Sequence, residues 1–257
     1  MNLLRVIDLE TTGDSFTNGG VVELGWQDLT ETSSGWTLQG PPQSTLIHPG
    51  HPISPSTSAI HHLVDEDVAN APTWPTAAPP VLQAPGVVAL AAHRAAFEQR
   101  WCTPALPRGT PRPRWVCTWK CALRLWPGAP THSNQGLRYW RRPEGLDRDA
   151  GMPAHRAGPD AYVTAHHLRD LLAEATLDQL LAWSAQPALL VRVPIGPLRG
   201  RSFAGLDEDA LDRIAAAEYG HNSDLLFTAR TERARRRGLP EPAVTTSHHS
   251  PQLPLAL

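Results

Sequence analysis

Asp8 and Glu10 stand one residue apart, directly after the apolar run 3–7 at the start of the chain. Such a run is typical of a β-strand, whose side chains alternate between faces, so both carboxylates are predicted to project from the same side. Crowded carboxylates repel each other unless a cation lies between them, and a divalent metal bound through oxygen is the usual solution. The alternative is an edge strand with two solvated acids, which we disfavour because so apolar a strand is normally central.

Three further residues able to do related chemistry lie later in the chain. Glu98 follows the apolar stretch 87–92, near the expected carboxyl end of a strand, where open α/β sheets hold their sites. His155 and Asp160 flank the helix-start signal Gly158-Pro159, which predicts Asp160 in the first turn and His155 in the preceding loop. Each has an ordinary alternative reading, as a surface acid, a loop histidine or a first-turn acid favoured by the helix dipole.

The elements that position these residues are predicted from periodicity and turn signals. Strands near 3–10 and 21–26 and a third strand at 36–38 indicate an antiparallel meander, and the segment 44–47 is expected to extend the sheet. One or two short helices are expected within 53–67, and strands at 87–92 and 115–119 each lead into a helix. Further helices are predicted at 134–142, 158–173, 176–183, 207–218 and 222–237, with a strand at 189–194 between them. The pattern predicts an α/β protein.

Composition bounds the class of protein. The 257 residues are 41% hydrophobic, enough for one large domain or for a domain with an appendage. A formal net charge of −2 excludes a globally basic nucleic-acid coat, so a polyanion must be held by a local patch or through metals. Three cysteines without a C-x-x-C pair favour free thiols over a zinc site. With no signal peptide and no apolar run of ~20 residues, we expect a soluble, cytoplasmic protein.

Three stretches resemble, in order and spacing, the motifs of the DEDDh 3′–5′ exonucleases. This is the DnaQ-like or ribonuclease T superfamily, which includes the exodeoxyribonuclease X-like proteins. The first motif stands at 6–13, the second at 93–98 and the third at 155–161. The turn 194–200 with the helices after it is similar to the small carboxyl-terminal module of exodeoxyribonuclease X-like proteins. Three motifs in the right order make chance agreement improbable.

The second motif departs from the family pattern His-Asn-x-x-Phe-Asp. After His93 the chain has Arg94 where the family has asparagine, and Glu98 where it has aspartate. Glutamate is still a hard oxygen ligand, although it is one methylene longer. The departure bears on rate and on metal preference more than on the class of reaction.

The resemblance implies a ribonuclease H-like mixed five-stranded sheet flanked by helices. It implies an exonuclease domain at 1–178, a small α+β module at 188–238 and a tail at 239–257, which we expect to be disordered. The implied activity is metal-dependent 3′–5′ hydrolysis of phosphodiester bonds in DNA, preferably single-stranded, with release of nucleoside 5′-monophosphates. Two Mg²⁺ or Mn²⁺ ions are the implied cofactors. The implied catalytic residues are Asp8, Glu10, Glu98, His155 and Asp160, of which the four acids bind metal and His155 is the general base.

Several alternatives stay open at this stage. Changes at positions 94 and 98 also suit a catalytically weakened protein on the same fold that only binds nucleic acid or a polymerase. The arginine-rich segment 230–237 could follow a phosphate backbone or serve only its own helix dipole. Leu9 and Phe97 could contact a terminal base or pack in the core. DNA against RNA, oligomeric state and a role in repair, proofreading or phage DNA turnover are left undecided.

Overall fold

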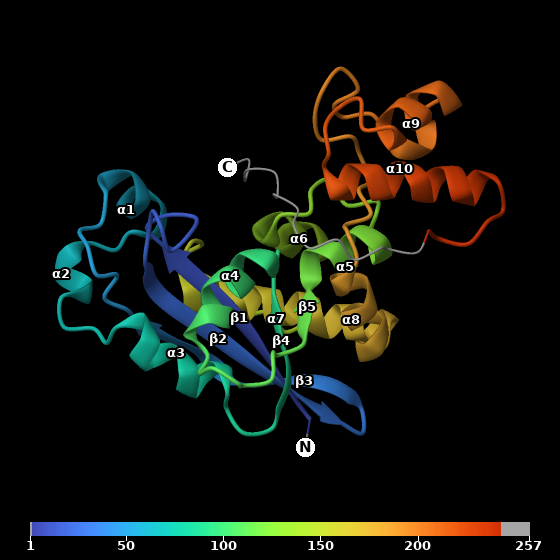
Figure 1. Ribbon diagram of the computed structural model, residues 1–257. Helices are drawn as coiled ribbons and strands as arrows, with labels where there is room; N and C mark the ends of the chain where they lie inside the picture. Colours follow the sequence, from blue (N-terminus) through green and yellow to red (C-terminus); the bar gives the residue numbers. More distant parts are fainter. Residues whose placement is uncertain (1, 243–257) are drawn as a thin grey trace.

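The computed structural model describes residues 2–242 and has a five-stranded mixed sheet at its centre, in the order β3-β2-β1-β4-β5 (Figure 1). The strands are β1 (Leu3–Thr11), β2 (Val21–Thr32), β3 (Gly35–Leu46), β4 (Val87–Ala92) and β5 (Trp115–Cys117). The first three form the predicted antiparallel meander, and β4 and β5 join parallel to β1. The sheet is therefore of the predicted ribonuclease H-like kind, with β1 in the middle.

Helices cover both faces of this sheet. The helices of the described residues are α1 (Pro55–His61), α2 (Asp65–Val68), α3 (Trp74–Leu82), α4 (Ala96–Ala105), α5 (Thr118–Leu125), α6 (Asn134–Arg141), α7 (Ala157–Glu174), α8 (Leu177–Ala185), α9 (Glu208–Ala215) and α10 (Ser223–Arg236), with a short 3₁₀ turn at Phe203–Gly205. Of these, α9 and α10 pack with each other and not on the sheet. On one face α7 packs against β1, β2 and β3, with α5 and α8 beside it. On the other face lie α3 and α4. Within residues 2–242, none of the helices combines the length and apolar character needed to span a lipid bilayer.

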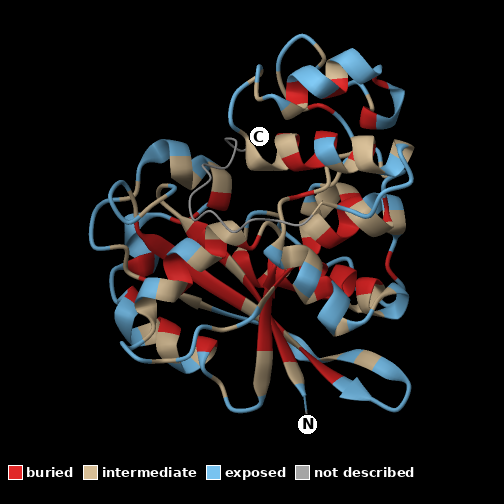
Figure 2. Ribbon diagram, turned by 45° about the vertical axis from the view of Figure 1, so that its right-hand side comes forward, coloured by how far each residue is buried: buried red, intermediate tan, exposed pale blue. Residues whose placement is uncertain are grey.

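The alternation of β1 decides which face carries the carboxylates. Leu4 and Val6 are buried against α7, whereas Ile7 and Leu9 are buried against α3 and α4. Asp8 continues the α7 face, and Glu10 follows it at a spacing of two. The buried residues run along the inner faces of the sheet and helices, and Figure 2 shows them as a continuous band through the centre of the molecule. The predicted placement of the two acids on one side of a central strand is confirmed.

Residues 188–241, here named the C-terminal module, build a small hydrophobic cluster of their own around Phe203, Leu211, Ile214 and Leu225. In Figure 1 the module lies beyond α5 and α6, at the upper right. The segment that links it to α8 is tied to the sheet domain, because Lys120 donates to the carbonyl of Gln186 and Arg124 donates to its Oε1 at 2.7 Å. The expected tail falls mostly on 243–257, which lie outside the described residues.

The structure corrects three predicted elements. The helix of the second motif begins at Ala96 rather than at 93, because Arg94 has a left-handed backbone (φ 69°) that a helix cannot include. The strand expected at 189–194 is reduced to one isolated bridge between Arg192 and Ser202, so the regular elements of the described module are helices and the predicted α+β character is not found. The two strand segments predicted at 36–38 and 44–47 form the single edge strand β3, where prolines are tolerated.

Candidate active site

Asp8, Glu10 and Asp160 meet at the carboxyl end of β1. One carboxylate oxygen from each lies within 4.8 Å of the others, which is close enough for a shared metal ion. Glu10 and Asp160 are buried and Asp8 is half-buried. Asp8 and Glu10 come from the central strand, and Asp160 comes from the first turn of α7, whose amino end packs over β2. The structure thus brings together three of the five residues singled out in the sequence.

Asp160 is held in place by three donors. The backbone N–H of His155 donates to its Oδ2 at 2.7 Å, and Gln135 Nε2 donates to its Oδ1 at 2.7 Å. Asn134 Nδ2 donates to the Asp160 carbonyl at 3.1 Å and to Oδ1 at 3.3 Å. Asn134 and Gln135 lie at the amino end of α6, so α6 fixes the metal-facing end of α7.

The electrostatics of this group favour the binding of a cation. Burial, with the charges of Asp160, Glu10 and Glu98, raises the pKa of Asp8 well above its usual value. Burial, with Asp160 and Glu23, raises the pKa of Glu10 to about 8. Carboxyl groups packed in this way ionise fully only when positive charge is supplied. An all-oxygen group of this kind fits a hard divalent ion such as Mg²⁺ or Mn²⁺ and suits zinc poorly.

Glu98 lies in the first turn of α4, outside the group of three. Its side chain is buried, and its Oε2 has no hydrogen-bond partner in the part of the chain that the structure describes. Burial raises the pKa of Glu98 to about 8, and its charge contributes to the raised pKa values of Asp8 and Glu10. A buried carboxylate oxygen without a partner is costly, and a second cation would satisfy it. The unpartnered oxygen makes Glu98 able to bind a cation, although Glu98 lies outside the group of three.

His155 stands in the loop that precedes α7. Its side chain is exposed and its backbone is left-handed, with φ 60°. The main chain of His155 contacts Asp160, so the residue lies next to the carboxylate group, and its side chain is accessible to solvent.

His93 and Arg94 of the second motif serve the structure around the site. His93 shares hydrogen bonds with Thr118 Oγ1 at 3.0 Å and with the carbonyl of His132 at 2.8 Å, and burial lowers its pKa to about 3. Arg94 lies over the ring of Trp119, 4.4 Å from its centroid. The arginine that replaces the family's asparagine is thus held by a cation–π contact.

Two residues that the sequence did not single out complete the surroundings. Glu23 of β2 stands opposite Glu10 in the sheet register and is 1% exposed. It forms a two-pronged ion pair with Arg156, at 2.8 Å and 3.0 Å. The sequence offers one signal for Glu23, an acid inside the apolar run 21–24. Its role cannot be inferred from that signal until its partner Arg156 is known.

The arginine-rich end of α10 is mostly occupied by acids of its own module. Arg233 pairs with Asp212 at 2.7 Å, and Arg235 and Arg236 both pair with Glu232. These ion pairs with acidic side chains are a role that neither prediction for this segment named, and both the phosphate-backbone and the helix-dipole roles stay predictions. Leu9 is 6% exposed and packs in the core, as does the partly buried Phe97.

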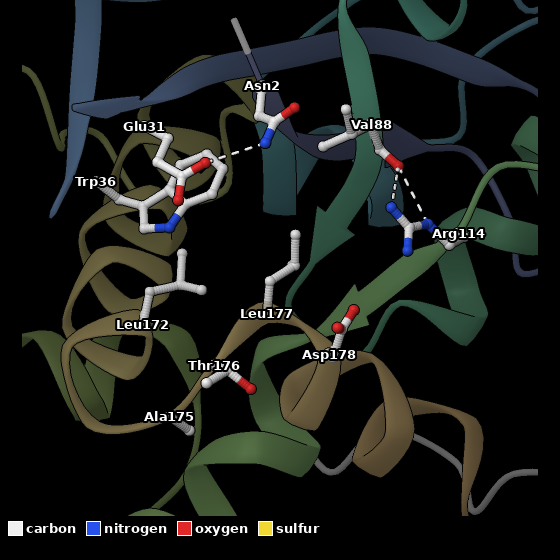
Figure 3. A pocket seen from close by; sticks show the side chains of 10 residues that line it. All are labelled: Asn2, Glu31, Trp36, Val88, Arg114, Leu172, Ala175, Thr176, Leu177 and Asp178. Carbon is white, nitrogen blue, oxygen red and sulfur yellow. Dashed lines mark hydrogen bonds between the residues drawn. The ribbon is translucent and has the colours of Figure 1, made fainter. Parts of the chain in front are cut away.

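A cavity of about 470 Å³ lies at the opposite end of the sheet (Figure 3). Val88 at the start of β4 and Leu177 at the start of α8 line it, and Asn2 donates to Glu31 across its mouth. Because Asp8 lies at the other end of β1, this cavity contributes nothing to the carboxylate group.

Comparison with characterised proteins decides the family. Exodeoxyribonuclease 10 of Escherichia coli K12 is 33% identical over 208 residues, which cover 80% of this chain and 86% of that protein. This chain belongs to the exodeoxyribonuclease X family. The same enzyme from a second Escherichia coli strain matches equally well. No general family model matches the chain. The protein is accordingly a 3′-exonuclease, from a metal-dependent family that binds nucleic acid.

Solved structures agree with this assignment. Exonuclease X in complex with 5′ overhanging duplex DNA is 31% identical and superposes with a TM-score of 0.56, covering 71% of this chain and 99% of that one. Exonuclease I also has a TM-score of 0.56, over 93% of this chain and 68% of that one, at 14% identity, so it supports the fold alone. The predicted fold class and the predicted family are both confirmed.

Proposed function

We propose that this exonuclease X family protein removes nucleotides one at a time from the 3′ end of DNA, preferably single-stranded, and releases nucleoside 5′-monophosphates. The observation that carries the proposal is the meeting of Asp8, Glu10 and Asp160 within 4.8 Å at the carboxyl end of the central strand. The structural relative bound to overhanging duplex DNA supports DNA as the substrate. The three free, buried cysteines accord with a reducing cytoplasm, where we place the activity.

Two divalent ions, Mg²⁺ or Mn²⁺, are the cofactors of the proposed reaction. Asp8, Glu10 and Asp160 would hold one ion, and Asp8 with Glu98 would hold the other. When bound, such ions supply a nucleophile at neutral pH and relieve the charge that develops on the leaving oxygen. The raised pKa values of Asp8 and Glu10 and the unpartnered Oε2 of Glu98 support this assignment of ligands.

The remaining steps fall to the chain's own residues. His155 is proposed as the general base, because an exposed imidazole can accept a proton from water at physiological pH. Its backbone N–H is bonded to Asp160, which keeps the residue next to the carboxylate group. Gln135 and Asn134 keep the Asp160 carboxylate oriented, so that it does not have to reorganise during the reaction.

The test is digestion of a 5′-labelled single-stranded DNA oligonucleotide with Mg²⁺ or Mn²⁺, beside matched RNA and duplex substrates. Wild type should give a ladder that shortens from the 3′ end, and Asp8→Ala should give none. Glu31→Ala is a matched control, because Glu31 is an exposed acid on the same sheet. Absence of cleavage on every substrate would overturn the proposal and would make Glu98→Asp the next variant to test.

No comparison points to a polymerase partner, and the proposed activity does not require one.

A further inference from the structure

Both carboxylate oxygens of Glu23 accept hydrogen bonds from the start of α7. Its Oε2 accepts from Arg156 Nε at 2.8 Å and from the backbone N–H of Ala157 at 3.1 Å, and its Oε1 accepts from Arg156 Nη2 at 3.0 Å. Glu98 differs, because one of its oxygens has no partner in the described part of the chain. A carboxylate saturated by a guanidinium and an amide has little capacity left for a metal ion.

The contact with Ala157 caps α7 from outside the helix. Arg156 occupies the N-cap position, and its own side chain makes no capping bond. The first N–H groups of a helix need acceptors, and negative charge is favourable there. Glu23 supplies both from the neighbouring strand β2. The capped turn directly follows His155 and itself carries Asp160.

The same ion pair also sets the charge around the metal ligands. Glu23 stands opposite Glu10 in the sheet, and its charge contributes to the raised pKa values of Asp8 and Glu10. The positive charge of Arg156 opposes the rise in the pKa of Glu10. Arg156 therefore offsets a buried negative charge that would otherwise add to the carboxylate group. A buried charge that loses its partner is strongly unfavourable.

We propose that Glu23 and Arg156 are positioning residues of the exonuclease reaction, which fix the turn carrying His155 and Asp160 and leave metal binding to the other acids. The inference rests on the proposed function for its catalytic part. Its structural part, a clamp between β2 and the start of α7, stands on the distances above.

The experiment compares Glu23→Gln, Arg156→Gln and the double variant with wild type. Glu31→Gln is the matched control, because Glu31 lies on the same strand, is exposed and accepts only from Asn2. For each protein we would measure kcat and KM on single-stranded DNA, the affinity for Mn²⁺ by electron paramagnetic resonance, and amide hydrogen exchange of the peptide 153–162. Measurement well below the melting temperature of each variant separates misplacement from unfolding.

Arg156→Gln is expected to lower kcat about 100-fold with KM within about threefold, because a displacement of about 1 Å in catalytic groups has that cost. Glu23→Gln should lower kcat about tenfold and leave the Mn²⁺ affinity within about threefold of wild type, since a positioning residue is not a ligand. The double variant should be at least as active as Arg156→Gln, because the second change removes the uncompensated buried charge. Amide exchange at 153–162 should accelerate in Arg156→Gln and stay unchanged in Glu31→Gln.

A loss of Mn²⁺ affinity above about tenfold in Glu23→Gln would make Glu23 a metal ligand and overturn the inference. Independent, multiplicative losses in the double variant would overturn it as well, as would unchanged kcat in both single variants. If wild type itself cut no DNA, the proposed function would fail, and the exchange measurement would still decide the clamp. Unchanged amide exchange in Arg156→Gln would then contradict the clamp.

Discussion

Gly25→Ala should lower both the stability of the protein and its kcat, although it changes no functional side chain. Gly25 lies on β2 opposite Asp8, at the point where α7 begins to cross the sheet. A Cβ added there would meet the backbone of Ala157 and Gly158 closer than 3.0 Å, a separation that real Cβ atoms essentially never show. Neither neighbour is a flexible side chain, so the strand and the helix must move apart.

The size of the effect follows from that movement. Ordinary contact for a Cβ begins at 3.4 Å, so the start of α7 must shift by about 1 Å. Overpacking of this kind costs about 1–3 kcal/mol, and we expect about 3 because both partners are backbone. Asp160 is three residues beyond Ala157 and moves with the helix. A displacement of about 1 Å lowers a catalytic rate about 100-fold.

Urea unfolding and steady-state kinetics on single-stranded DNA measure both quantities. Gly128→Ala is the control, because an added Cβ at Gly128 meets nothing within 4 Å, and it should behave as wild type in both assays. Gly25→Ala with the stability and kcat of Gly128→Ala would refute the idea that close approach of α7 to β2 positions the carboxylates.

Three other outcomes are expected. Without divalent metal, the free energy of unfolding should fall as pH rises from about 7 to 8. Burial raises the pKa of Glu10 and Glu98 to about 8, so in that window the folded protein binds more protons than the unfolded one, whereas histidines such as His93, whose pKa burial lowers, are neutral in both states. Urea titrations at several pH values measure this, and a rise over that window would contradict it. Asp8→Asn should increase the metal-free Tm by removing one repelling charge and should abolish the increase in Tm that Mg²⁺ gives wild type, as scanning calorimetry would record; a preserved Mg²⁺ effect would argue against Asp8 as a ligand. Gln135→Ala removes the 2.7 Å bond to Asp160 and should lower kcat about tenfold, equivalent to ~1.4 kcal/mol, with little change in KM, whereas an unchanged kcat would show that Asp160 needs no such support.

The first and third motifs could be predicted because their signals are local. Alternation along the first strand places Asp8 and Glu10 together, and the helix-start signal Gly158-Pro159 places Asp160 in a first turn. Local periodicity determines which way a side chain points. That the first strand and the helix of Asp160 lie together was implied by the resemblance to the DEDDh exonucleases.

The supporting residues could not be predicted because they are brought together only by tertiary packing. Glu23 and Arg156 are 133 positions apart, and Gln135 reaches Asp160 from a different helix. The late start of α4 at Ala96 also escaped prediction, because apolar spacing does not report the left-handed backbone at Arg94. Side-chain pairs and backbone conformations of this kind depend on tertiary contacts, which local sequence patterns do not reveal.

Release of a labelled 3′-terminal nucleotide from single-stranded DNA in Mg²⁺ is the most direct measurement. If the carboxylates at the end of β1 hydrolyse the last phosphodiester bond, the first labelled product is a nucleoside 5′-monophosphate. Its rate of release should then fall about 1000-fold or more in Asp8→Ala, since the loss of a metal-binding acid removes the charge stabilisation of the reaction. Label that stays in oligonucleotides, or equal release by wild type and Asp8→Ala, would contradict the assignment of this site as the exonuclease centre.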